Sequence, residues 1–296
     1  MRLAFYIADV FAEEKYAGNQ LAVFRDAGGL PSEEMQKIAA EMNYSETTFI
    51  LSEEERDGGY DVRIFTPREE VPFAGHPVLG TAHVIRSEIV GKPVERVVLN
   101  LKGGKIPVEF GRSGGEEGGV VWMKQTAPVF GKTFDRGRVG RVLGLRNGRI
   151  DPDYPVQEVS TGLPAILVPL KDLAAFRQCE VDRKGYFELI QGSEAKALFA
   201  FSPEPYNEEN DLSARLFADY YGVPEDPATG SAGGYLAGYL LRYGYLGESP
   251  VDVRVEQGHE IGRPSVLYLR AEEDGDGGTR VSVGGKVAMV ACGKLL

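Results

Sequence analysis

Two short stretches of this sequence carry polar residues, a proline and a glycine at matching positions. Residues 76–82 (HPVLGTA) align with residues 226–232 (DPATGSA) when the chain is shifted by 150 positions (226 − 76 = 150). The shift places the imidazole of His76 over the carboxylate of Asp226, and both groups can bind or move protons. Two copies of a half-site that face each other would form one cleft, and here the copies differ in the residue that would do chemistry.

The same shift relates other parts of the chain. Residues 48–52 (TFILS) align with 198–202 (LFAFS), and Ser32 and Asp182 each precede a segment with helical periodicity. One duplicated unit therefore accounts for most of the length. We expect a first half at residues 1–135 and a second at 136–296, with a strand near 286–296 available to complete the first. Residues 136–155 lack a clear period and are the expected connector.

The local patterns predict many short strands and few helices. In the first half, residues with high strand propensity, bounded by turn formers, occur at 3–8, 21–24, 47–51, 60–65 and 96–101. Ser32 is the expected cap of a helix that buries a stripe of Met35, Ile38, Ala39 and Met42. The matching helix after Asp182 should bury Tyr186, Leu189 and Ile190.

Each repeated motif introduces the most apolar helix of its half. The second of these helices contains Gly233, Gly234 and Gly238, and each glycine costs about 1 kcal/mol relative to alanine in a helix interior. That cost is tolerable where another element packs closely on the helix backbone, as in a helix that runs through a curled sheet. We therefore expect an α+β fold of two pseudo-symmetric strand-rich barrels, each wrapped around a central helix.

The start of each central helix is a candidate binding site for an anion. The first turn of a helix leaves backbone N–H groups unpaired and carries partial positive charge. Gly75 and His76 in one half, with Thr229, Gly230 and Ser231 in the other, could therefore bind a substrate carboxylate.

Composition narrows the classes of partner. The chain has 296 residues, a formal net charge of −11, 43% hydrophobic and 26% charged residues. The acidic balance argues against nucleic acid, and no apolar run approaches the roughly 20 residues of a membrane helix. The sequence offers few ligands for a metal site, because it has three histidines and two distant cysteines, Cys179 and Cys292. We expect a cytoplasmic protein without a metal, and self-association into a homodimer stays open.

Several segments, taken together and in order, resemble the PhzF family of phenazine-biosynthesis-like isomerases. They are residues 9–11 (DVF), 18–23 (GNQLAV), 43–49 (NYSETTF), 63–67 (RIFTP), 72–82 (PFAGHPVLGTA) and 225–232 (EDPATGSA). The resemblance covers nearly the whole chain. It implies the diaminopimelate-epimerase-like fold, with an active site between two barrels that each surround a helix.

The resemblance also implies roles for particular residues. The catalytic glutamate of the family falls on Glu46, its histidine on His76, its aspartate on Asp226 and its hydroxyl residue on Ser231. Glu46 would move a proton between two carbons of a small carboxylic acid without a cofactor, and the other three would hold and polarise the substrate. The expected substrate contacts are Asn19, Gly75, Thr229 and Gly230.

Other interpretations remain open at this point. A racemase or epimerase of the same fold would use two thiols, but Ala74 and Thr229 occupy the two positions before the motif glycines where such relatives carry cysteine. A non-catalytic protein that binds small acids is the second alternative, with Asp226 serving only as a helix cap. The repeat counterpart of Glu46 is Lys196, so the duplicated scaffold does not itself require an acid at this place.

Overall fold

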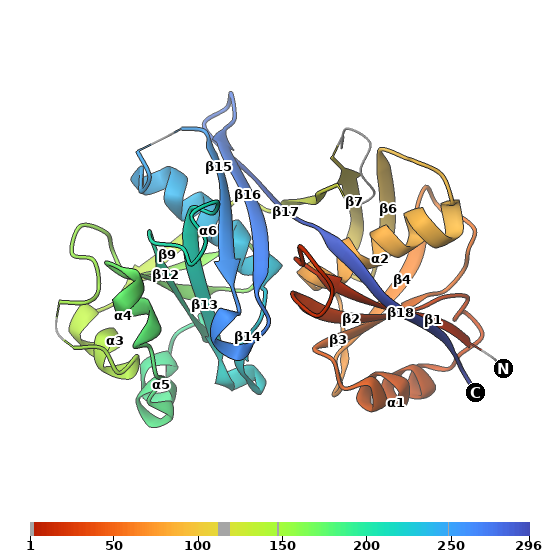
Figure 1. The fold of residues 1–296 in the computed structure, drawn as a ribbon, viewed down its shortest axis with the longest axis horizontal. Coiled ribbons are helices and arrows are strands. Elements are labelled where there is room, and N and C mark those ends of the chain that lie inside the picture. Colours follow the sequence, from red (N-terminus) through yellow and green to blue (C-terminus); the bar gives the residue numbers. More distant parts are fainter. Residues whose placement is uncertain (1–2, 112–118, 147, 248) are drawn as a thin grey trace. The chain divides into compact units, whose positions relative to one another are not determined.

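The computed structural model describes residues 3–111, 119–146, 148–247 and 249–296, which form two compact units (Figure 1). The first unit combines Met1–Lys124 with Gly284–Leu296, and the second is the continuous segment Gln125–Val283. The division therefore falls upstream of the boundary expected between residues 135 and 136. The glycine-rich residues 112–119, whose sequence favours a hairpin turn, lie almost entirely outside the described residues.

The strands of the first unit form a sheet that begins with the C-terminal strand. Its order is β18–β1–β2–β3–β4–β6–β7–β8, with β5 paired to β4. Two neighbouring pairs are parallel, β2 with β3 and β4 with β6. The bounds are β1 Leu3–Val10, β2 Asn19–Phe24, β3 Glu46–Ile50, β4 Tyr60–Phe65, β5 Glu70–Val71, β6 Arg96–Leu101, β7 Gly104–Phe110, β8 Val121–Gln125 and β18 Val287–Leu295.

The second unit repeats this pairing pattern. Its order is β9–β10–β11–β12–β13–β15–β16, with β14 paired to β13, and the parallel pairs are β11 with β12 and β13 with β15. The repeat found in the sequence is therefore a repeat of strand topology. The bounds are β9 Val129–Thr133, β10 Gln157–Ser160, β11 Ala165–Pro169, β12 Ala197–Ser202, β13 Leu212–Ala218, β14 Val223–Asp226, β15 Val251–Gln257 and β16 Ser265–Glu273. β17 (Thr279–Gly285) begins in this unit, and its last two residues are assigned to the first.

Helix α2 (Gly75–Val84) is the central helix of the first unit. It is buried along almost its whole length and contacts β1, β2, β3, β6, β7 and β18. A Cβ atom on Gly80 would lie 2.6 Å from Leu21 Cδ2 and 2.8 Å from Val10 Cγ2, so glycine permits the close approach of these strands. A π-helical turn, η1 (Ile85–Val90), follows α2 directly.

Helix α6 (Gly230–Tyr243) is the corresponding helix of the second unit, and it contacts β10, β15 and β16. The close packing expected at its glycines is confirmed. A Cβ atom would lie 2.7 Å from Leu269 at Gly233, and 2.4 Å from Pro128 at Gly238. Each unit is thus a strand-rich α+β structure around a central helix, as the sequence predicted.

The two smaller repeated helices show where the capping prediction succeeds and fails. Asp182 caps α5 (Arg183–Ile190) by accepting hydrogen bonds from the backbone N–H groups of Lys184 and Gly185. Ser32 is not a cap, because it is the first residue of α1 (Ser32–Met42) and Pro31 occupies the cap position. The Ser32 hydroxyl instead accepts a hydrogen bond from Arg63 Nη1 at 3.0 Å.

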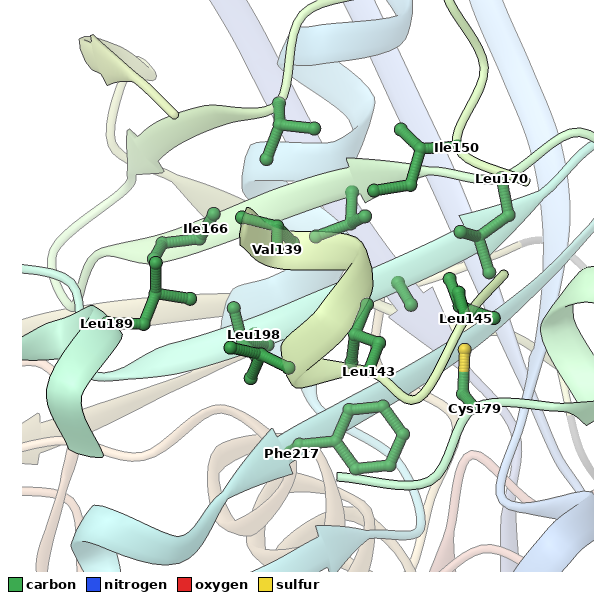
Figure 2. Packing of buried hydrophobic residues seen from close by; sticks show 14 of the residues in the cluster. Val139, Leu143, Leu145, Ile150, Ile166, Leu170, Cys179, Leu189, Leu198 and Phe217 are labelled. Carbon is green, nitrogen blue, oxygen red and sulfur yellow. The ribbon is translucent and has the colours of Figure 1, made fainter. Parts of the chain in front are cut away.

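The expected connector at residues 136–155 is wrong for its first part, which folds as helix α3 (Arg136–Val142). Asp135 caps this helix at the Arg138 N–H group, and the helix buries Val139 and Val142. Figure 2 shows the surrounding core, to which α3, α4 (Leu173–Arg177), α5 and the sheet contribute. Cys179 follows the end of α4 and is buried in this core, and burial raises its pKa to about 12.

Candidate active site

In the first unit, the structure brings two predicted site residues together. Glu46 is the first residue of β3, and His76 is the second residue of α2. Glu46 Oε2 lies 3.5 Å from His76 Nε2. A buried hydrogen bond of 2.8 Å between the hydroxyls of Thr48 and Thr81 ties the same strand to the same helix. The spacing between acid and imidazole is therefore set by two elements that are joined in the core.

The imidazole of His76 is held neutral by its surroundings. Burial lowers the pKa of His76 to about 3, and a hydrogen bond to the backbone of Gln20 opposes this shift only in part. Nε2 has no hydrogen-bond partner among the described residues, so the ring N–H that donates to Gln20 belongs to Nδ1. Nε2 thus presents a lone pair in the direction of Glu46.

Asn19 and Gly75 are the remaining predicted residues of this unit. Asn19, the first residue of β2, is buried next to Gln20. Gly75 is the first residue of α2, and the cap residue Ala74 makes no side-chain hydrogen bond to the first turn. The predicted helix start at Gly75 is confirmed, and the first-turn N–H groups donate no hydrogen bond to the side chain of the cap residue.

In the second unit, Asp226 is the last residue of β14 and does not cap α6. Thr229 holds the cap position, and its hydroxyl donates a hydrogen bond to Asp226 Oδ2. Ser231 is the second residue of α6, and its backbone carbonyl accepts a 3.4 Å hydrogen bond from the Thr161 hydroxyl. Thr229 and Gly230 therefore form the helix start predicted for them.

Gln257, which sequence reasoning did not single out, is a neighbour of two predicted site residues. This last residue of β15 is 1% exposed, and its amide contacts both Asp226 and Thr229. The available signal was a pair of consecutive polar residues, Glu256 and Gln257, that ends an alternating strand and precedes a glycine. Polar residues at such a place are mostly exposed, which is why the pattern alone did not single them out.

A buried ion pair holds the strand just before Asp226. Arg215 on β13 donates from Nε and Nη2 to the two carboxylate oxygens of Glu225, each at 2.8 Å. Arg215 Nη1 also donates to the backbone carbonyls of Phe176 and Cys179. A two-pronged pair of this kind fixes orientation as well as distance, so β14 enters the Asp226 turn in one position.

The repeat counterpart of Glu46 has a different task. Lys196 precedes β12, and its ammonium donates to the backbone carbonyls of Ile190 at 3.2 Å and Ser193 at 2.6 Å. Lys196 thus supports the end of α5, which gives the second unit a structural cation where the first has an acid. The duplicated halves are equal in fold and unequal in chemistry.

Metal-ligating side chains lie scattered over the part of the chain that the structure describes. Within those ranges, no three His, Cys, Asp or Glu side chains gather into a group that could hold a metal ion. Among the same residues, no helix is both long and apolar enough to cross a membrane.

Comparisons with known proteins identify the family and the relatives of this chain. The family model for phenazine biosynthesis-like protein matches residues 8–293. The trans-2,3-dihydro-3-hydroxyanthranilate isomerase of Pseudomonas aeruginosa is 35% identical over 294 residues, which cover 98% of each chain. The enzyme of the same name from Pseudomonas chlororaphis is 36% identical and covers 95% of each chain.

Solved structures agree with the sequence comparison. A phenazine biosynthesis protein of the PhzF family from Bacillus anthracis has a TM-score of 0.91 at 26% identity, with 100% of this chain and 99% of that chain covered. A probable proline racemase from Agrobacterium radiobacter has a TM-score of 0.61 at 9% identity, covering 99% of this chain and 93% of that one, which is a likeness of fold alone. The chain is therefore an isomerase and belongs to the family of phenazine biosynthesis-like proteins.

Proposed function

We propose that this isomerase moves a proton between two carbons of a small carboxylic acid, with Glu46 as the acid and base. The observation that carries the proposal is the 3.5 Å contact of Glu46 Oε2 with His76 Nε2, both of which are buried atoms. A carboxylate beside a neutral imidazole can take a proton from one carbon and return a proton to another.

The proposed reaction has two balanced steps. The Glu46 carboxylate takes a proton from a carbon next to an unsaturated or carbonyl group, and the electron pair of the broken C–H bond spreads into that group. The Glu46 carboxyl then returns the proton to a different carbon of the same molecule. Because no electrons leave the substrate, the reaction as proposed needs no redox cofactor.

His76 serves in this proposal as a fixed hydrogen-bond acceptor. With its pKa lowered to about 3, the imidazole is not a cation at neutral pH and cannot supply a second acid. Its Nε2 lone pair can accept a hydrogen bond from the protonated form of Glu46 or from a polar hydrogen of the substrate. This supports a mechanism in which one group, Glu46, carries the proton in both steps.

We further propose that residues of the second unit hold the polar groups of the substrate. Asp226 would accept a hydrogen bond from an amino or hydroxyl group, and Ser231 would contact the carboxylate. The N–H groups at Gly75 and at Gly230 would each offer partial positive charge to an anionic group. Asn19 and Thr229 are the further contacts that we expect.

The relatives suggest the first compound to test. Their name states that they act on trans-2,3-dihydro-3-hydroxyanthranilate, a small acid with an amino group, a hydroxyl group and adjacent double bonds. We propose that the substrate of this chain belongs to the same chemical class, the unsaturated amino or hydroxy acids. Trans-2,3-dihydro-3-hydroxyanthranilate serves as a probe of that class.

Deuterium uptake tests the proposal. The protein is incubated in heavy water with trans-2,3-dihydro-3-hydroxyanthranilate and a panel of unsaturated amino and hydroxy acids, and mass spectrometry follows deuterium at carbon. We expect time-dependent uptake with at least one acid, loss of uptake in Asp226→Asn, and unchanged uptake in the exposed α1 variant Glu41→Gln. An acid that binds but never gains deuterium or changes structure would refute the proposal.

A further inference from the structure

We propose that Gln257 is a positioning residue that directs the Thr229 hydroxyl at the Asp226 carboxylate and so fixes how Asp226 meets the substrate. The inference rests on the proposed function, because it assigns Asp226 a substrate contact. Gln257 itself need not touch the substrate.

The orientation of the Gln257 amide is determined by partners that each allow one role. The backbone N–H group of Thr229 can only donate, so the oxygen 3.3 Å away must be Gln257 Oε1. The backbone carbonyl of Asp226 can only accept, so the atom 2.8 Å away must be Nε2. The two ends of the amide are therefore not interchangeable.

This orientation decides the direction of the next hydrogen bond. Gln257 Nε2 also lies 3.1 Å from Thr229 Oγ1, and an amide nitrogen has no lone pair with which to accept. Nε2 must donate to the hydroxyl oxygen, so the hydroxyl hydrogen has to point elsewhere. It points to Asp226 Oδ2, which completes a directed chain from Gln257 through Thr229 to Asp226.

The backbone beside Gln257 holds the same turn by contact. Gly258 has a φ of +81°, and a Cβ atom there would lie 2.6 Å from the Pro227 carbonyl oxygen and 2.4 Å from that of Arg263. Glycine at this position lets β15 press against the turn that follows Asp226. With the Arg215–Glu225 pair on the other side, the Asp226 turn is anchored before and after the aspartate.

A directed chain of this kind has a consequence for recognition. The Thr229 hydroxyl could rotate to donate to the ligand if Gln257 did not occupy its lone pair. With Gln257 in place, the hydroxyl is committed to Asp226, and the carboxylate is held in one orientation as an acceptor. We expect a substrate that presents an N–H or O–H donor to Asp226, and weak binding of analogues that replace this donor with an ether or ketone.

Four variants separate positioning from mere structural support. Thr229→Val and Gln257→Met remove the hydroxyl and the amide with little change in shape, and each should lower kcat/KM about 10- to 100-fold, the range for a lost hydrogen bond to a charged group. Thr229→Ser, which keeps the hydroxyl, should stay within about threefold of the parent protein. The double variant of Gln257→Met with Thr229→Val should be no worse than the poorer single variant, because both break one chain.

Effects of Gln257→Met and Thr229→Val that multiply in the double variant would overturn the inference, as would failure of Thr229→Ser to rescue activity. Thermal unfolding of all four variants checks that each is folded.

A spectroscopic measurement tests the chain without turnover. In protein labelled with ¹⁵N glutamine, the side-chain amide protons of Gln257 are assigned by their loss in Gln257→Met. We expect one of the two protons to move upfield in Thr229→Val and to keep its position in Thr229→Ser, while the other, bonded to the Asp226 carbonyl, stays in place. Two unchanged protons in Thr229→Val would refute the chain even if no acid is turned over, whereas an inactive parent protein would refute only the proposed function.

Discussion

The two copies of the duplicated unit differ at the positions that carry charge. Glu46 corresponds to Lys196, and His76 corresponds to Asp226. Lys196 is used to support a helix end, while Glu46 faces an imidazole. Because the scaffold is the same in both halves, these substitutions, and not the fold, give the first unit its acid. Chemistry is therefore decided at the scale of the residue.

The burial of His76 predicts a pH dependence of stability. An unfolded histidine titrates near its ordinary pKa of about 6.5, whereas the folded His76 stays neutral down to about 3. Between these values the unfolded state binds the extra proton, so the free energy of unfolding falls as the pH falls, by about 1.4 kcal/mol per pH unit at most. Above pH 6.5, His76 does not contribute to the change of the free energy of unfolding with pH.

Urea unfolding of the parent protein and of His76→Gln at pH 7 and pH 5 measures that contribution. We expect the loss of stability between the two pH values to be smaller in His76→Gln by about 2 kcal/mol. Any constant cost of the substitution cancels, because only the difference between the two pH values is compared. Equal losses in both proteins would mean that His76 in the folded protein is already protonated at pH 5.

At the scale of elements, glycines in helices predict stability changes of opposite sign. At Gly80 in α2, a methyl group would lie within 2.8 Å of both Leu21 and Val10, so Gly80→Ala should lower the free energy of unfolding by about 1–3 kcal/mol. Gly140 in α3 has only Ile150 nearby, at 3.7 Å, so Gly140→Ala should gain helix propensity and raise stability by about 0.5–1 kcal/mol. Chemical unfolding of the two variants decides whether close packing requires glycine in α2.

The turn behind Asp226 offers a second matched pair. Gly258 and Gly262 flank the short helix η3 (His259–Ile261), with φ angles of +81° and +70°. A Cβ atom at Gly262 meets nothing within 4 Å. Gly262→Ala should therefore lower the free energy of unfolding only by about 1–2 kcal/mol, the cost of alanine in the left-handed conformation. Gly258→Ala adds overlap with two backbone oxygens and should cost about 1–3 kcal/mol more.

The Gly258→Ala variant should also weaken ligand binding, measured by calorimetry with the acid identified by deuterium uptake. Similar affinity and stability in the Gly258→Ala and Gly262→Ala variants would show that the Asp226 turn does not depend on this contact.

At the scale of the whole molecule, the first unit is closed by the end of the chain. β18 pairs with β1 from Leu3↔Leu295 to Val10↔Val287, and α2 contacts β18. The second unit, Gln125–Val283, is continuous in sequence and does not include β18. The two units should therefore respond differently to the loss of β18.

Hydrogen exchange of a chain that ends at Gly285 tests this difference. We expect the amide protons of α2 to exchange faster than in the full chain, because the sheet around α2 has lost an edge. The amide protons of α6 should keep most of their protection. Equal loss of protection in α2 and α6 would show that the units unfold as one.

Much of this fold could be predicted from the sequence, because the repeated motifs carry strong local signals. The expected strands occur in the structure, α2 and α6 begin at Gly75 and Gly230, and the helix glycines pack as predicted. The cap at Ser32 failed because Ser32 is already helical and Arg63, distant in sequence, binds its hydroxyl. Helix α3 was missed because a helix of two turns shows too little periodicity to be recognised.

The proposed site could be derived from the sequence to a more limited extent. Glu46, His76, Asp226 and Ser231 came from the motifs, whereas Gln257 came only from tertiary contacts. Its partners Asp226 and Thr229 lie on another strand and a helix start, and no spacing rule relates them to β15. Supporting residues of this kind become visible only when the elements are packed.

The most direct test of the central claim is the turnover of Glu46→Gln measured beside its ligand affinity. Glutamine keeps the size of the side chain and cannot take a proton from carbon, so kcat should fall by about a thousandfold or more while the dissociation constant stays within about threefold. Glu41→Gln, on the exposed face of α1, should match the parent protein in both measurements. A Glu46→Gln variant that turns over substrate near the parent rate would contradict the assignment of Glu46 as the group that carries the proton.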